Sequence, residues 1–177
     1  MTEMENPGRA YQQQLLELVG DEDPALVQAQ TADVMRQFVA DASDLVGSRP
    51  APGEFSVAEL VGHLVDAELV TSTRYRWILA QDEPALPGYE QDDWVRVSGY
   101  ADADPGELLE VFRVVRRANL DLWRRTPAAL RTRVGHHSER GPESYDLTFR
   151  LTAGHDRLHL DQARRTVEAL KAEVEGV

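Results

Sequence analysis

Apolar residues recur at alternating steps of three and four along most of the chain, which is the spacing of one face of an α-helix. Glycine, proline and acidic residues separate these stretches. We find no strand pattern of convincing length and no repeat of short period. The helices that this pattern predicts lie at about residues 10–19, 24–29, 31–46, 56–80, 105–125 and 145–170.

Capping residues indicate where several of these helices begin. Ser56 and Glu59 form a capping box, in which the serine oxygen accepts a hydrogen bond from the backbone of the third helical residue. Asp104 followed by Pro105 marks another start, because proline suits the first helical position. Thr31 is typical of a cap, so we expect a short helix before it and a long helix after it.

Two polar segments between the long helices are predicted to be irregular. Residues 82–95 are acidic and rich in turn formers, and we expect a surface connection there rather than a loop over a site. Residues 131–146 are too polar and glycine-rich for a core element. They contain His136 and His137, two adjacent residues that we expect to point in different directions and to be exposed.

The length and order of the predicted helices favour one architecture. Four long helices with linkers at their ends are typical of a four-helix bundle, so the expected fold is all-α with additional short N-terminal helices. The 177 residues suffice for one core, and we expect a single domain over residues 1–177 with a helical extension at about 9–30. Apolar faces on that extension could support a homodimer.

The last long helix carries two histidines, His155 and His159, four residues apart. Residues at this spacing lie above one another on the same helix face, so both imidazoles could converge on one point. That face also carries Leu151 and Leu158, which indicates that it is apolar and turned inward. Buried imidazoles need a compensating interaction, and a divalent metal would supply one.

A third histidine lies on a second inward face. His63 belongs to a stripe at helical spacing whose other members are Leu60, Ala67, Val70, Arg74 and Trp77. Together His63, His155 and His159 would give three protein ligands with an open position. This is the catalytic type of zinc site, in which bound water ionises near neutral pH. Imidazole suits Zn, Ni and Fe alike, so the metal is undetermined.

Other interpretations of these histidines remain open. Each could be a hydrogen-bonded core residue. The metal could instead be structural, in which case a fourth ligand would close the site, and His136 or His137 could supply it if their loop folds inward. The segment HDRLH is similar to the zinc-protease pattern HExxH, but its acid is one methylene shorter and no third ligand follows it.

Three charged residues near the histidines are candidates for a supporting role. Asp66 and Asp156 could each orient an imidazole through its second nitrogen. The alternative, which the pattern favours, places each of them in solvent on the outer helix face. Arg74 shares the stripe of His63 and could bind a carboxylate of a substrate or thiol cofactor; it could equally pair with an acid across the bundle or reach solvent.

Composition excludes several classes of function. The 19 basic and 31 acidic residues give a net charge of −12, which argues against nonspecific binding to nucleic acid or anionic membranes. No cysteine is present, so any thiol would have to come from a small molecule. The polar N-terminus does not resemble a secretory signal, and no apolar run reaches about 20 residues, so we expect a cytoplasmic protein.

Three motifs carry a resemblance to a known family. The segments SVAELVGHLVDAE, LPGYEQDDWV and GHDRLHLDQ follow one another in this order, with an Asp-Pro-initiated helix between the last two. Over about residues 31–170 the chain resembles the DinB-like, or YfiT-like, superfamily of metal-binding four-helix bundles. The resemblance implies that a histidine of the second bundle helix and an HxxxH pair of the last helix hold a divalent metal. Those positions are His63, His155 and His159.

The resemblance also implies an activity. Characterised relatives include mycothiol-dependent isomerases and bacillithiol S-transferases. A metal with an open position would deprotonate an incoming thiol and make it a nucleophile. We therefore predict a divalent-metal-dependent S-transferase that uses a low-molecular-weight thiol and a small-molecule substrate in detoxification or stress response. The alternative is a DinB-like metal-binding protein of unassigned reaction, hydrolytic or non-catalytic.

Overall fold

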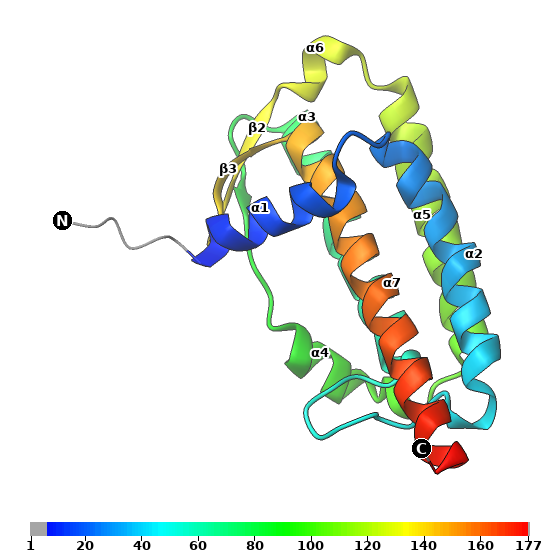
Figure 1. The fold of residues 1–177 in the computed structure, drawn as a ribbon. Helices are drawn as coiled ribbons and strands as arrows, with labels where there is room; N and C mark the ends of the chain where they lie inside the picture. The colour runs from blue at the N-terminus through cyan, green and yellow to red at the C-terminus, as the bar shows by residue number, and fades with distance from the viewer. Residues whose placement is uncertain (1–6, 177) are drawn as a thin grey trace.

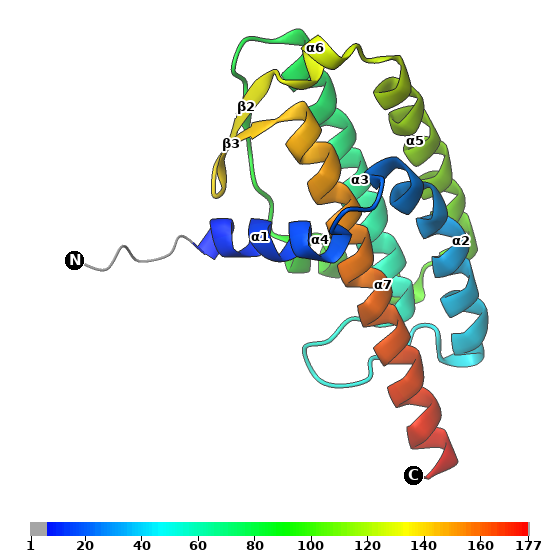
Figure 2. The same cartoon turned by 45° about the horizontal axis from the view of Figure 1, so that its top comes forward.

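The computed structural model describes residues 7–176 and shows an all-α bundle (Figures 1 and 2). Its four long helices are α2 (Pro24–Ala42), α3 (Val57–Ala80), α5 (Pro105–Arg125) and α7 (Tyr145–Glu175). Helices α2 and α3 each pack against both α5 and α7. The N-terminal helix α1 (Pro7–Val19) crosses α7 on the outside of the bundle. The predicted fold class, a four-helix bundle with additional N-terminal helix, is confirmed.

The helix starts that the sequence marks are present. The hydroxyl of Ser56 accepts a hydrogen bond from the backbone N–H of Glu59, and the carboxylate of Glu59 accepts one from the backbone of Ser56. Asp104 caps α5 through the backbone N–H groups of Gly106 and Glu107. These contacts satisfy backbone donors that have no partner inside the helix.

Helix α2 differs from the prediction, because Thr31 does not begin a new helix. It lies in the middle of one continuous helix that starts at Pro24. The hydroxyl of Thr31 donates to Asp156 across the bundle at 2.8 Å and to the carbonyl of Val27 at 3.2 Å. The residue type that suggests a cap serves here as a buried link between α2 and α7. The 3₁₀ turn Ser43–Leu45 follows α2.

The two polar segments that the sequence predicts to be irregular contain short regular elements. One small sheet has the order β1-β2-β3, with β1 parallel to β2 and β2 antiparallel to β3. Strands of two to four residues are too short to show a periodic pattern, so the prediction missed them. The first segment contains β1 (Ala85–Leu86) and the start of α4 (Gln91–Ser98), and the second contains β2 (Val134–His137) and β3 (Gly141–Ser144). The 3₁₀ turn Tyr100–Asp102 follows α4, and α6 (Ala128–Arg131) leads into the second segment.

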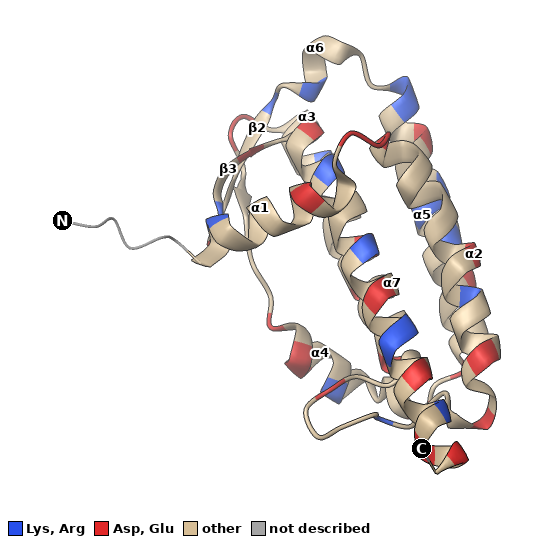
Figure 3. Cartoon of the chain, in the orientation of Figure 1, with Lys and Arg blue, Asp and Glu red and all other residues tan. Residues whose placement is uncertain are grey.

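Charges of both signs lie on the outside of the bundle. Figure 3 shows acidic and basic positions following one another along the outer face of α7. Asp161 pairs there with Arg164 and Arg165, and Glu168 with Arg164. Within residues 7–176, no helix combines the length and the apolar character needed to cross a membrane.

A buried layer of charged residues separates two apolar parts of the core. One apolar cluster includes Leu64 and Phe112, and the other includes Tyr75 and Phe149. Between them along the helices lie Glu68 of α3, Arg116 of α5 and Asp156 of α7. Each of these three side chains is at most 4% exposed. The expectation that Asp156 lies in solvent is wrong, because Asp156 lies on the buried face of α7.

The guanidinium of Arg116 holds this layer together. Its Nη2 lies 2.7 Å from Glu68 Oε2 and 3.0 Å from Asp156 Oδ1, and its Nη1 contacts Asp156 Oδ2. Nη1 also donates to the carbonyl oxygen of Gln28 at 3.1 Å. One side chain therefore links all four bundle helices. Buried charges are tolerated only with such partners.

Substitution of Asp156 tests this layer. We expect Asp156→Asn to lower the free energy of unfolding by about 3 kcal/mol, because it removes one of two buried carboxylates that neutralise Arg116. Urea unfolding measures the change. Asp161→Asn on the exposed face of the same helix is the control, and it should cost less than about 1 kcal/mol. Equal effects of the two variants would contradict a structural role for the buried layer.

The close approach of α1 to α7 gives a second prediction. A Cβ atom at Gly154 would lie 2.1 Å from the backbone carbonyl oxygen of Leu15, so the two helices meet where no side chain fits. We expect Gly154→Ala to lower the free energy of unfolding by roughly 1–3 kcal/mol through overpacking. Amide hydrogen exchange should show α1 losing protection first. Alanine alone favours helix by about 1 kcal/mol, so a neutral or stabilising effect would contradict the close contact.

Candidate metal centre

The packing of α3 against α7 brings the three predicted histidines together. His63 comes from α3, and His155 and His159 come from consecutive turns of α7. The Nε2 atom of His63 lies 3.1 Å from the Nε2 atoms of both His155 and His159. All three ligand atoms lie within 4.8 Å of one another. The three imidazoles thus face one common point, although their role as ligands stays a prediction.

Burial keeps these imidazoles neutral. His63 is 1% exposed and His159 is 6% exposed, while His155 is half-buried. Burial, with the nearby His159, lowers the pKa of His63 to about 3. Burial also lowers the pKa of His159 to about 4 and that of His155 well below its ordinary value. Neutral imidazole is the form that binds a metal.

The hydrogen bonds of the rings fit a metal at their Nε2 atoms. His159 Nδ1 lies 2.9 Å from the amide oxygen of Gln162, which can only accept. The proton of His159 is therefore on Nδ1, and its Nε2 carries a lone pair toward the other rings. His63 Nε2 faces two further nitrogens and has at most one proton to share. A divalent cation among the three nitrogens would use all three lone pairs.

The two aspartates predicted to orient imidazoles contact other groups. Asp66 accepts a hydrogen bond from the hydroxyl of Tyr100 at 2.8 Å, and Asp156 binds Arg116 and Thr31. Both are buried, so the favoured expectation of solvated carboxylates is wrong for Asp66 as well. Among the described residues, the side chain outside the cluster that hydrogen-bonds to one of its histidines is that of Gln162. Its position three residues after His159, one helical turn on, is the signal that could have identified it.

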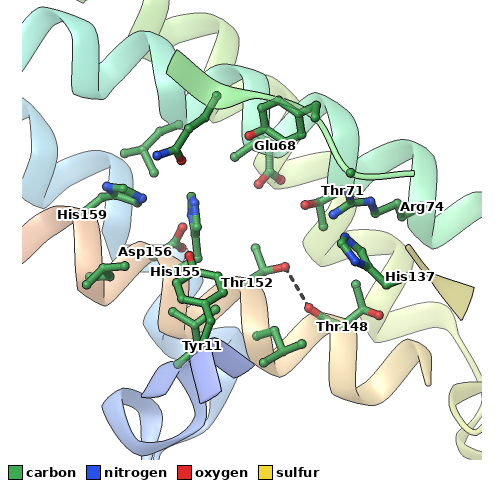
Figure 4. A pocket seen from close by; sticks show the side chains of 18 of the residues that line it. Tyr11, Glu68, Thr71, Arg74, His137, Thr148, Thr152, His155, Asp156 and His159 are labelled. Carbon is green, nitrogen blue, oxygen red and sulfur yellow. Dashed lines mark hydrogen bonds between the residues drawn. The ribbon is translucent and has the colours of Figure 1, made fainter. Parts of the chain in front are cut away.

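A cavity of about 390 Å³ opens beside the histidines. His155 and His159 line one end, and Arg74 and His137 line the other (Figure 4). Residues 88–91 of the acidic segment also line it. The prediction of a plain surface connection is therefore wrong for this part, because the segment covers a site. Strand β1, paired with β2, holds it against the bundle.

The structure places Arg74 and His137 inside the protein. Arg74 is 7% exposed, so it does not extend into solvent, and its Nη2 donates to the carbonyl of Pro87 at 2.5 Å. His136 is exposed and contacts Glu83, as expected for this loop. His137 is 4% exposed, which contradicts its predicted exposure. Neighbouring residues of a strand point to opposite faces, and β2 follows this rule.

The chain belongs to the DinB superfamily, whose family model matches residues 26–163. This range contains α3, α5, all but the first two residues of α2, and the two histidines of α7. The resemblance that the sequence motifs carry is therefore confirmed.

Two individual proteins are similar to this chain. A protein of Geobacillus thermodenitrificans (strain NG80-2) named "Putative metal-dependent hydrolase" is 33% identical over 67 residues, which are 37% of this chain and 38% of that protein. The chain thus matches well under half of that relative. The structure of YfiT from Bacillus subtilis aligns over 84% of this chain and 86% of its own, with a TM-score of 0.78 and 18% identity. YfiT is described as "a probable metal-dependent hydrolase with an unusual four-helix bundle topology". At this identity the likeness shows the fold.

The lowered pKa values predict how stability depends on pH in the metal-free protein. His63 and His159 have folded pKa values of about 3 and about 4, below the ordinary value of 6.5. Below pH 6.5 the unfolded chain therefore binds more protons than the folded one. The stability conferred by neutral histidines is present above pH 6.5 and is lost progressively as the pH falls toward 4. Urea unfolding at pH 7, 6 and 5 measures this loss.

Two histidine variants test whether the buried cluster causes this loss of stability at low pH. His159→Gln removes one titrating group, so its stability should fall less between pH 7 and 5. His136→Gln removes an exposed histidine and should keep the full fall of the wild type. Parallel curves for all three proteins would contradict the assignment to the buried cluster.

Proposed function

We propose that this chain is a divalent-metal-dependent enzyme that acts on a small molecule held in the cavity. The observation that carries the proposal is the convergence of three neutral imidazoles, two of which, His155 and His159, line a cavity of about 390 Å³. That volume lies within the range of about 300–1,000 Å³ found for small-molecule sites. The descriptions of the Geobacillus relative and of YfiT as metal-dependent hydrolases support the same class.

His63, His155 and His159 would hold the metal through Nε2. Among residues 7–176, no fourth histidine or carboxylate joins their group, whereas a structural site is normally closed by four protein ligands. His137, the candidate for that fourth position, lies at the other end of the cavity. When bound, a divalent metal would supply a positive charge that lowers the pKa of a water or thiol reaching it.

The remaining residues position and shield this site. Gln162 fixes the ring of His159 by accepting the Nδ1 proton. Asp156 anchors the turn of α7 that carries His155, through its contacts with Arg116 and Thr31. Residues 88–91 line the cavity and form part of its wall. Such fixed, partly desolvated surroundings strengthen electrostatic interactions within a site.

Two reactions differ in the nucleophile. In the first, a low-molecular-weight thiol of the bacillithiol type loses its proton and attacks an electrophilic carbon of the substrate. A C–S bond forms as the bond to the leaving group breaks, and the leaving group departs with the electron pair, giving S-transfer in detoxification or stress response. The absence of cysteine means that the sulfur comes from the co-substrate. In the second, water is the nucleophile and the protein is a hydrolase, which is how its relatives are described. Both reactions use the same three histidines.

Removal of a ligand tests the metal site directly. We expect untagged wild-type protein to bind about one divalent metal per chain, and His63→Ala or His159→Ala to weaken metal binding by more than about 100-fold. His136→Ala, which removes an exposed histidine of β2, should bind metal as the wild type does. Elemental analysis gives the stoichiometry, and far-UV circular dichroism shows that the bundle remains folded.

Turnover by the metal-loaded protein distinguishes the two reactions. Consumption of an electrophile that requires bacillithiol and fails in His63→Ala supports the transferase. Consumption of an activated ester without any thiol, lost in the same variant, supports the hydrolase. Wild-type protein that retains no metal would overturn both.

A further inference from the structure

A second polar cluster lies in the cavity, at the end away from the three histidines. Arg74 of α3 and His137 of β2 form it, with the side chain of Thr71 beside them (Figure 4). His155 and His159 line the opposite end of the same cavity. A molecule that fills the cavity would therefore contact both clusters.

Arg74 is a buried cation, and in the described part of the chain it has no anionic partner. It is 7% exposed, and among residues 7–176 no carboxylate lies within ion-pairing distance of its guanidinium. Its Nη2 donates to the carbonyl of Pro87, but its buried Nε has no hydrogen-bond partner in the described structure. A buried charge without compensation is costly, which contrasts with Arg116 and its two carboxylates. An anion from outside the chain would supply the missing partner.

The charged residues around Arg74 do not supply this anionic partner. Arg140, also a lining residue, is bound at two positions by Glu143, at 2.5 and 3.2 Å. Burial, and next Arg140, lower the pKa of Arg74, while Glu143, Tyr89 and Glu139 act more weakly in the opposite direction. Glu143 is already occupied by Arg140, and the side chain of Glu139, which also lines the cavity, is exposed. The guanidinium nevertheless stays charged at neutral pH.

His137 adds a fixed donor next to Arg74. Its Nδ1 accepts from the backbone N–H groups of Glu139 and Arg140, at 3.2 and 3.4 Å. The ring proton is therefore on Nε2, which is buried and has no partner in the described structure. The side chain is 4% exposed, and Figure 4 shows its ring directed toward Arg74. Two unpartnered buried donors thus share one end of the cavity.

We propose that Arg74 and His137 bind a carboxylate of the molecule whose reacting group lies at the histidine cluster. Only the position of the reacting group at the histidine cluster rests on the proposed function. A planar guanidinium and an imidazole N–H both donate, and a carboxylate accepts from each of them. Neutral ends, such as an ester or an alkyl group, leave the charge of Arg74 without compensation.

The spacing of the two ends of the cavity along α7 sets the length of the bound ligand. Seven residues of α7 separate Thr148, which lines the Arg74 end, from His155, which corresponds to roughly 10 Å along the helix axis. The ligand is therefore elongated, with its carboxylate and its reacting group at opposite ends. The carboxylate could belong to the thiol co-substrate or to the second substrate, since both would present the same terminal group.

Binding of octanoate tests the carboxylate end separately. We expect calorimetry to show that wild-type protein binds octanoate more tightly than methyl octanoate. Arg74→Gln should weaken octanoate binding by about 10- to 100-fold, the loss expected for charge-assisted hydrogen bonds, and should not change methyl octanoate binding. His137→Phe should weaken octanoate binding in the same direction. The control is Arg76→Gln, an exposed arginine of α3 that donates to Ser72, and it should bind as the wild type does.

A second substitution at position 74 distinguishes loss of the binding site from unfolding of the protein. Arg74→Lys keeps the charge and the stem, and it should bind octanoate with an affinity between those of the wild type and Arg74→Gln. Equal binding of octanoate and its ester by the wild type would overturn the proposal. So would unchanged octanoate binding in folded Arg74→Gln, as checked by circular dichroism.

The metal content of the same samples separates this proposal from the proposed function. Arg74→Gln should retain metal, whereas His159→Ala should lose metal and still bind octanoate. If wild-type protein binds no metal, the proposed metal-dependent reaction is wrong. The octanoate measurements would still decide whether the carboxylate site exists. In metal-loaded protein, tighter binding of 8-mercaptooctanoate than of octanoate assigns the carboxylate to the thiol co-substrate. Equal binding assigns it to the second substrate, and both results support the site.

Discussion

The buried ion pairs of Arg116 are the constraint on which the structure depends. A guanidinium between two apolar clusters is stable only where Glu68 and Asp156 both reach it, so α3, α5 and α7 must keep one register. His63 precedes Glu68 by little more than one helical turn, and His155 is adjacent to Asp156. The register that satisfies the buried charge is therefore also the register that brings the imidazoles together.

The cavity next to this layer has two chemically different ends. Burial holds the imidazoles neutral at one end, so they offer lone pairs. At the other end Arg74 is charged and His137 presents a proton, so both of these side chains offer donors. A ligand that satisfies both ends has one orientation, and this would direct its reacting group toward the histidines. The small sheet takes part in this arrangement, because β2 carries His137 and β1 positions the covering segment.

Pairs of nearby residues of the same type show why burial matters more than residue type. His136 and His137 are neighbours in one strand, yet one is exposed and pairs with Glu83 while the other is buried in the cavity. The same distinction separates Arg76 from Arg74, two residues apart on α3. In each pair the chemistry available to a side chain follows from the face on which the strand or helix places it.

The sequence by itself determined most of the long helices, the caps at Ser56 and Asp104, the bundle and its family, because these depend on local periodicity and on short motifs. It also picked out His63, His155 and His159, since helical spacing puts each on an apolar face. Only the tertiary structure decided that Thr31 and Asp156 meet inside the core and that a polar segment covers a cavity. Those outcomes depend on contacts between segments more than 100 residues apart or on strands too short for a pattern, so no local rule contains them.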